Sequence, residues 1–204
     1  MRPMEFAKRT AANKAIDYFM EDPVPRIESM MATVNKMLPD ALFPSQRKAF
    51  NQAIEERNNW YQLICRVADL DPDVATGLLK CFLTEANLVA WDKQEKSREK
   101  YQCNIPWAVL LDPTSACNLH CTGCWAAEYG HKLNLSYDDI DSIINQANEL
   151  GTHVFIYTGG EPLVRKVDLI RLCEAHPDCA FLCFTNATLI DEESCQEMIR
   201  VKNF

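Results

Sequence analysis

Strand-like and helix-like segments alternate three times between Trp107 and Phe204. Short apolar runs at 107–111, 154–157 and 180–184 have the pattern of buried strands. A segment with helical periodicity follows each run, and Ser136 and Asp191 are placed to cap the first and the third of these helices. This order predicts parallel βα units, and therefore an α/β fold for the second half of the chain.

The first hundred residues have the pattern of helices broken by proline. Apolar residues recur at helical spacing over 27–38, and a second long helix is expected to begin after Pro44, with Ser45 as its cap, and to reach Cys65. Asp71 followed by Pro72 predicts the start of a third helix, whose charged tail at 92–100 is expected to be a solvated helix end or a linker. The methionines of 30–37 could line a partner groove, but a packed helical core is the stronger expectation.

Composition also changes near residue 100. Residues 1–100 carry 15 basic and 15 acidic side chains, so the whole formal net charge of −8 falls on 101–204, together with eight of the ten cysteines. We therefore expect a helical N-terminal segment at 1–100 and a second unit at 101–204. The acidic balance disfavours direct nucleic-acid binding, and neither an apolar leader nor a run of about 20 apolar residues is seen. We expect a cytoplasmic protein whose clustered cysteines are metal ligands or redox groups.

Three cysteines, Cys117, Cys121 and Cys124, form a C-x3-C-x2-C motif after the first predicted strand. Thiolates are soft ligands that suit iron–sulfur clusters or zinc. Structural zinc sites use four ligands, commonly as two separated pairs, whereas a cubane cluster held by three thiolates leaves one iron open to another ligand. The motif therefore favours an iron–sulfur cluster with one exchangeable iron.

Two other interpretations of this loop stay open. His120 and His131 could complete a zinc site, which would make the chain a zinc- or cluster-stabilised interaction module without catalysis. Cys121 and Cys124 could instead form the redox pair of a thiol–disulfide oxidoreductase, but Cys117 would then have no role.

An auxiliary cluster has four candidate ligands in the sequence: Cys173, Cys179, Cys183 and Cys195. Cys173 and Cys195 fall on apolar helix faces, so we expect them to be buried as small hydrophobic residues.

Unusual loops follow all three predicted strands. The cysteine motif follows the first, Gly159-Gly160-Glu161-Pro162 follows the second, and Thr-Asn-Ala-Thr at 185–188 follows the third. Because functional groups collect at the carboxyl ends of parallel strands, we expect the site here. The two glycines would let the backbone approach a ligand closely, Glu161 offers a carboxylate to an ammonium group, and Asn186 could bind a ligand or cap the next turn.

A C-x3-C-x2-C motif after the first strand, with Gly-Gly-Glu-Pro after the second, resembles the radical S-adenosylmethionine (radical SAM) superfamily. The resemblance covers roughly residues 105–204 and implies the first three βα units of a partial radical-SAM-type (β/α)6 barrel, here preceded by a helical segment. It also implies a radical SAM enzyme, in which Cys117, Cys121 and Cys124 bind a [4Fe–4S] cluster and S-adenosyl-L-methionine chelates the fourth iron. Reductive cleavage of this cofactor would give a 5′-deoxyadenosyl radical that abstracts hydrogen from a substrate.

The resemblance also suggests contacts around that cofactor. Glu161, with Gly159 and Gly160 beside it, matches the family's contact with the methionine amino group, and Asn186 and Trp125 are further candidate cofactor-binding residues. Many members carry an aromatic residue just before the third cysteine, where this chain has a glycine, with Trp125 just after.

The family barrel usually has six βα units, so we expect the chain to be the front portion of a longer protein. Its substrate, which could be a peptide, a nucleotide or a small metabolite, is not indicated by the motifs. An electron donor such as flavodoxin or ferredoxin is an expected partner, and a membrane is not.

Overall fold

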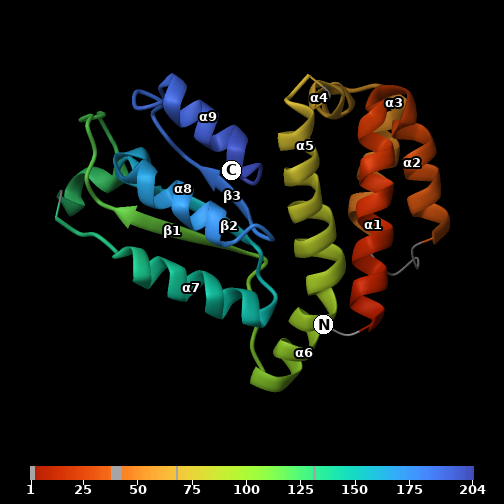
Figure 1. The fold of residues 1–204 in the computed structure, drawn as a ribbon, viewed down its shortest axis with the longest axis horizontal. Coiled ribbons are helices and arrows are strands. Elements are labelled where there is room, and N and C mark those ends of the chain that lie inside the picture. Colours follow the sequence, from red (N-terminus) through yellow and green to blue (C-terminus); the bar gives the residue numbers. More distant parts are fainter. Residues whose placement is uncertain (1–2, 38–42, 68, 131) are drawn as a thin grey trace.

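A computed structural model describes residues 3–37, 43–67, 69–130 and 132–204 (Figure 1). A helical part is followed by a three-stranded parallel sheet with its own helices, as the sequence predicts. None of the helices in the described ranges is both long and apolar enough to cross a membrane. The helical part consists of α1 (Pro3–Glu21), α2 (Pro23–Met37), α3 (Pro44–Glu56), α4 (Asn59–Val67), α5 (Pro72–Leu79), the π-helix η1 (Lys80–Val89) and α6 (Ala90–Tyr101).

The second expected helix is in fact two helices. Arg57 adopts a left-handed conformation with φ of 52° and ends α3. The side chain of Asn58 then starts α4, because its Oδ1 accepts a hydrogen bond from the backbone nitrogen of Trp60 at 3.0 Å. The prediction that Ser45 caps this helix is wrong, since α3 begins at Pro44 without a side-chain cap.

The third expected helix begins as predicted but continues much further. Asp71 caps α5 by accepting from the backbone nitrogens of Asp73 and Val74. The chain then passes through η1 into α6 and remains helical to Tyr101. The charged tail is not simply solvated, because Gln94 is buried and donates to the carbonyl of Gly151 at 2.7 Å.

The helix α1 does not follow from the apolar pattern in the sequence, and packing against η1 holds it in place. Ile16 and Phe19 are buried, and the guanidinium of Arg9 makes two hydrogen bonds to Glu85 of η1, at 2.6 and 2.7 Å. In α2 only Ile27 is buried among the side chains described, so the methionine-rich stripe does not form the packed core that we expect. Leu38, at the end of that stripe, lies outside the described residues.

The sheet contains β1 (Ala108–Thr114), β2 (Val154–Gly159) and β3 (Ala180–Cys183) in that order, all parallel. Each strand is followed by a helix: α7 (Tyr137–Leu150), α8 (Lys166–Ala175) and α9 (Glu192–Val201). The predicted capping boxes at Ser136 and Asp191 are both formed, and Gly151 ends α7 with φ of 98°. The three βα units expected from the sequence are therefore present.

One face of the sheet carries the core. Phe155, Tyr157 and Phe181 are completely or almost completely buried, with the Phe155 and Phe181 rings stacked at 5.7 Å between centroids, and they pack with apolar residues of α7 and α8. On the opposite face Leu110 and Leu182 are exposed and flank Ile156 in register. The alternation along each strand thus separates a covered face from an open one.

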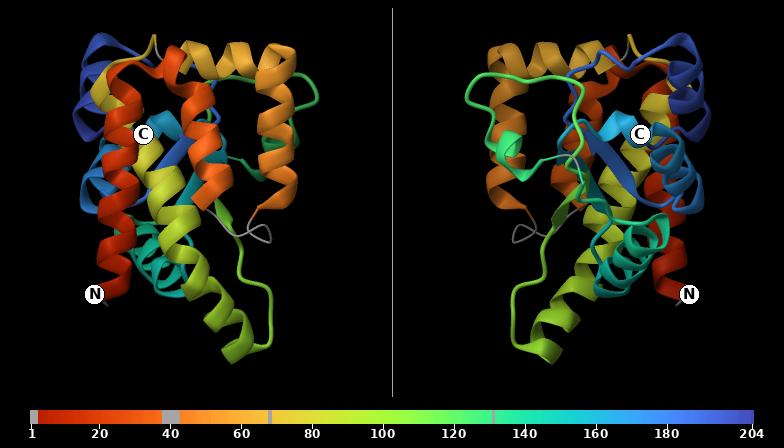
Figure 2. Two further views of the ribbon diagram at one scale, coloured as in Figure 1. Left: turned by 90° about the vertical axis from the view of Figure 1, so that its right-hand side faces the viewer. Right: turned by 90° about the vertical axis from the view of Figure 1, so that its left-hand side faces the viewer.

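The helical part lies against the edge of the sheet where the strands begin (Figures 1 and 2). Cys81 of η1 donates its thiol hydrogen to the carbonyl of Pro177, just before β3. Lys93 of α6 donates to the carbonyl of Asn148 at the end of α7. The carboxyl edge, where the cysteine loop lies, faces away from these contacts.

Asn203, just after α9, joins the end of α8 to the segment that leads into β3. Its buried side chain donates to the carbonyls of Cys173, His176 and Cys179 at 3.0–3.1 Å. We expect Asn203→Ala to lower the free energy of unfolding by about 2–3 kcal/mol, because buried carbonyls lose their donor. Urea unfolding measures the change. Asn145→Ala removes a surface hydrogen bond to Asp141 and should cost much less; equal losses for the two variants would contradict the assignment.

Candidate functional site

The three predicted loops meet at the carboxyl edge of the sheet. The backbone nitrogen of Gly160 donates to the carbonyl of Thr114 at 3.0 Å, and that of Glu161 donates to the carbonyl of Ala116 at 2.8 Å. The loop after β2 is thereby fixed directly to the chain that leads into the cysteine motif.

The two glycines are required by this close approach. Gly159 has φ of 103°, and a Cβ there would lie 2.8 Å from the carbonyl oxygen of Thr114. A Cβ on Gly160 would overlap the carbonyl of Ala116. In this structure the backbone that comes close to the glycines is therefore the start of the cysteine loop. Their predicted contact with a cofactor remains a prediction.

Glu161 is buried, with 1% of its surface exposed, and its carboxylate faces inward. Oε1 accepts from the backbone nitrogen of Leu163 at 2.9 Å and from the hydroxyl of Thr185 at 2.7 Å, while Oε2 accepts from the backbone nitrogen of Asn186 at 2.8 Å. A carboxylate has about four acceptor positions, so three of them are used here. Glu161 thus joins the second loop to the third, and its predicted contact with an amino group stays a prediction.

Asn186 joins the third loop to the first. Its Nδ2 donates to Oδ1 of Asn118, within the cysteine motif, at 2.9 Å, and Asn118 donates in turn to the hydroxyl of Thr188 at 2.7 Å. The Oδ1 of Asn186 also accepts from the backbone nitrogen of Thr188, so the side chain does cap the following turn. That it also binds a ligand stays a prediction.

The three motif cysteines lie on the outer side of this cluster of loops. Cys117 is half-buried, Cys121 and Cys124 are exposed, and a backbone hydrogen bond of 3.3 Å from Cys124 to Cys121 closes the turn between them. Within the described part of the chain, the three sulfurs are not gathered within 4.8 Å of one another as ligands of one ion would be. A set of accessible thiols suits a cluster, in which each thiolate binds a different iron.

The aromatic residue predicted near the cofactor lies at the edge of the same loop. Trp125 begins a short 3-10 helix, η2 (Trp125–Tyr129), is 60% exposed and packs edge-to-face on Tyr129 with centroids 5.9 Å apart. A contact between Trp125 and a cofactor stays a prediction. His131, a candidate ligand in the zinc interpretation, lies outside the described residues.

The four candidate ligands of an auxiliary cluster differ in their burial. Cys173 and Cys179 are fully buried, as expected for Cys173, whereas Cys195 is half-buried. Burial, together with the negative charge of Glu161, raises the pKa of the Cys183 thiol to about 12. Burial also raises the pKa of the Cys173 thiol, so Cys173 and Cys183 are protonated and unreactive near neutral pH.

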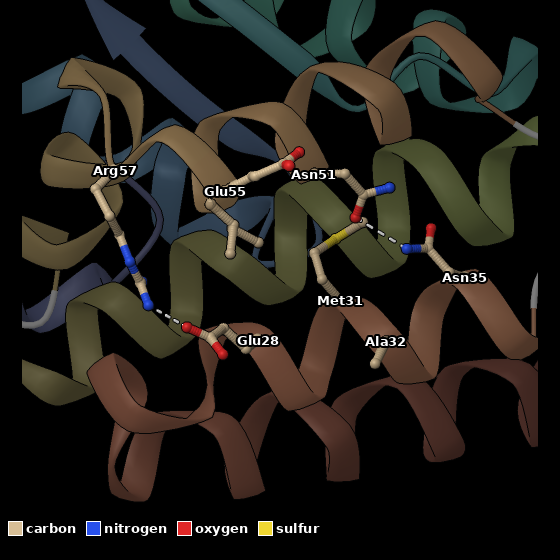
Figure 3. A pocket seen from close by; sticks show the side chains of 8 residues that line it. Glu28, Met31, Ala32, Asn35, Asn51, Glu55 and Arg57 are labelled. Carbon is tan, nitrogen blue, oxygen red and sulfur yellow. Dashed lines mark hydrogen bonds and ion pairs between the residues drawn. The ribbon is translucent and has the colours of Figure 1, made fainter.

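A hollow of about 460 Å³ lies far from these loops, between α2 and α3 (Figure 3). Met31 lines it, and Asn35 donates to Asn51 across it at 2.9 Å. An ion pair between Arg57 and Glu28 closes one end. Its polar rim and open shape do not resemble an apolar ligand pocket.

Two contributors to the site were not assigned from the sequence. Asn118 and Thr185 link the loops through their side chains. Asn118 lies between the motif cysteines, and Thr185 directly precedes Asn186. Their position in the segments that follow β1 and β3 was the available signal.

Comparison with known proteins points to the part of the chain that contains these three loops. The model of the Radical SAM superfamily matches residues 111–204. A PqqA peptide cyclase from Bradyrhizobium diazoefficiens is 31% identical over 111 residues, covering 52% of this chain and 28% of that protein. A GTP 3′,8-cyclase from Clostridium perfringens is 26% identical over 107 residues, covering 50% of this chain and 33% of that protein.

An uncharacterised protein from Archaeoglobus fulgidus is 31% identical over 111 residues, which are 52% of this chain and 26% of that protein. The chain thus spans a third or less of the length of these relatives. No solved structure matches the chain significantly. The matched segment contains the cysteine motif and the Gly-Gly-Glu-Pro turn, and this part of the chain therefore belongs to the Radical SAM superfamily.

Proposed function

We propose that the chain is part of a radical SAM enzyme whose cluster and cofactor lie at the carboxyl edge of the sheet. The main support is that the cysteine loop, the Gly-Gly-Glu-Pro turn and the loop after β3 are hydrogen-bonded to one another there. Loops that are fixed to one another in this way present a preorganised edge on which a cluster and a cofactor can be held side by side.

In this proposal the thiolates of Cys117, Cys121 and Cys124 hold a [4Fe–4S] cluster. With S-adenosyl-L-methionine bound, the cluster would supply the electron that cleaves the cofactor and so generates a 5′-deoxyadenosyl radical for hydrogen abstraction. The chain's own residues bind and orient. The glycines keep the cysteine loop close, and Glu161 holds the loop after β3 in register with it.

The substrate stays open within this proposal. The two named relatives are called a peptide cyclase and a GTP cyclase, so the family match is compatible with peptide and nucleotide substrates alike. A flavodoxin or ferredoxin is the proposed electron donor, and a cytoplasmic location is proposed because the oxygen-sensitive cluster needs reduced thiols.

Removing any of the three motif thiols should abolish the cluster. We expect Cys117→Ala, Cys121→Ala and Cys124→Ala, each reconstituted anaerobically with iron and sulfide, to retain less than about a tenth of the parent's iron, because each thiolate holds one iron of the cluster. Cys103→Ala, at an exposed cysteine outside the motif, is the matched control. Iron analysis and absorption spectroscopy measure the result. Full iron content in all three variants would sink the proposal.

Removing the charge of Glu161 should weaken cofactor binding without loss of the cluster. Glu161→Gln preserves the shape of the side chain and the oxygen that accepts from Leu163 and Thr185, and it loses one loop contact, the hydrogen bond from the backbone nitrogen of Asn186. We expect an affinity for S-adenosyl-L-methionine about tenfold lower, as for the loss of one charge-assisted hydrogen bond, with iron content unchanged. Calorimetry on the reconstituted protein measures it. Glu192→Gln, on the exposed start of α9, is the control; unchanged affinity in Glu161→Gln would contradict a role for this carboxylate.

Alkylation of thiols should separate the cluster hypothesis from a thiol–disulfide oxidoreductase. In the apo protein the exposed Cys121 and Cys124 should react with iodoacetamide, while the buried Cys173 should not. Loading with iron and sulfide should then protect the motif cysteines, which peptide mass spectrometry detects. Unprotected motif thiols in a protein that binds no iron, with a Cys121–Cys124 disulfide after oxidation, would favour the oxidoreductase.

A further inference from the structure

A second set of metal-ligating side chains lies at the opposite edge of the sheet, where the strands begin. His153 directly precedes β2, and Asp178 and Cys179 directly precede β3. Because Val154 pairs with Ala180 in the parallel register, the residues before these two positions are brought side by side. The cysteine loop, which follows β1, lies at the opposite, carboxyl edge of the sheet.

The three ligand atoms have the spacing of one coordination shell. Nδ1 of His153 lies 3.9 Å from Sγ of Cys179. The Asp178 carboxylate approaches both, with Oδ2 at 3.4 Å from the His153 nitrogen and its other oxygen, Oδ1, at 3.8 Å from the sulfur. A tetrahedral zinc ion with bonds of about 2.0–2.3 Å to nitrogen, oxygen and sulfur separates its ligand atoms by about 3.4–3.6 Å. In the described part of the chain, this is the group whose three ligand atoms all lie within 4.8 Å of one another.

Two of the three side chains are buried and the third is partly exposed, which suits an enclosed ion that has an entry path. Cys179 is fully buried and His153 nearly so, whereas the Asp178 side chain is 47% exposed. An ion would enter past the carboxylate and be shielded by the other two ligands. One thiolate and one carboxylate balance the charge of a divalent cation. Sulfur and imidazole nitrogen together favour zinc over magnesium or calcium, which prefer oxygen ligands.

Two neighbouring groups of opposite charge face the site, because the carboxylate of Glu85 and the ammonium of Lys93 both act on His153. Oδ1 of Asn148, at the end of α7, accepts from the Cys179 thiol at 3.3 Å, and it is near enough to serve as a fourth ligand once a metal replaces the thiol hydrogen. Glu85 of η1 also approaches the group, but its carboxylate is held by two hydrogen bonds from Arg9. Cys81 of η1 meets the carbonyl of Pro177 next to Asp178.

We propose that His153, Asp178 and Cys179 form a zinc site, which fixes the starts of β2 and β3 to each other and stiffens the edge against which the helical part packs. This site is independent of the cluster motif. Neither the family match nor the relatives' names assign a role to these residues.

The test uses the full 204-residue chain carrying Cys117→Ser, Cys121→Ser and Cys124→Ser, so that the motif cannot take up metal. Zinc binding is measured by competition with a chromophoric chelator, and cobalt is added as a spectroscopic probe. We expect one zinc per chain, a thiolate-to-cobalt charge-transfer band, and a higher Tm with zinc than without it. His153→Gln should weaken zinc binding by about tenfold or more, and Cys179→Ser should remove the charge-transfer band.

His176→Gln is the matched control. His176 is also buried and also paired with an aspartate, since its Nε2 lies 2.8 Å from Oδ1 of Asp141, but it is not part of the ligand group. It should lose comparable packing and keep full zinc affinity. The proposal is wrong if the parent binds no zinc, or if His153→Gln and His176→Gln lower the affinity equally. Should the triple serine variant not fold, zinc is counted beside iron in the cluster-loaded chain, with the same pair of histidine variants.

Discussion

The buried carboxylate of Glu161 is the interaction on which the candidate site depends. It accepts hydrogen bonds from Thr185 and Asn186 in the loop after β3, while its own backbone nitrogen donates to Ala116 at the start of the cysteine loop. A buried carboxylate is costly unless its oxygens are paired. The pairing therefore favours one arrangement of three loops that are remote in sequence, and this arrangement presents the cysteine motif.

The two edges of the sheet have different roles. The carboxyl edge carries the motif that matches the Radical SAM superfamily, and the helical part contacts the other edge through η1 and α6. A helical part placed there supports the strands without covering the loops. The open face, with Leu110 and Leu182 exposed, lies between the two edges.

Much of the α/β half could be predicted from the sequence, because its signals are local. Alternating apolar runs mark the strands, the capping boxes at Ser136 and Asp191 mark helix starts, and Gly151 marks a helix end. The helical half was harder. The apolar pattern of 45–65 does not show that the backbone of Arg57 adopts a left-handed conformation. The helix α1 is held mainly by contacts with η1, which lies far along the chain.

The sequence by itself determined the cysteine motif, the glycine turn and the order of strands, since each depends on residues close together in the chain. Only the tertiary structure decided that Glu161 faces inward, that Asn118 and Asn186 bind each other, and that His153 meets Cys179. The physical reason is that parallel pairing joins residues tens of positions apart. Which side chains meet at a sheet edge then depends on register and packing, and no local pattern records these.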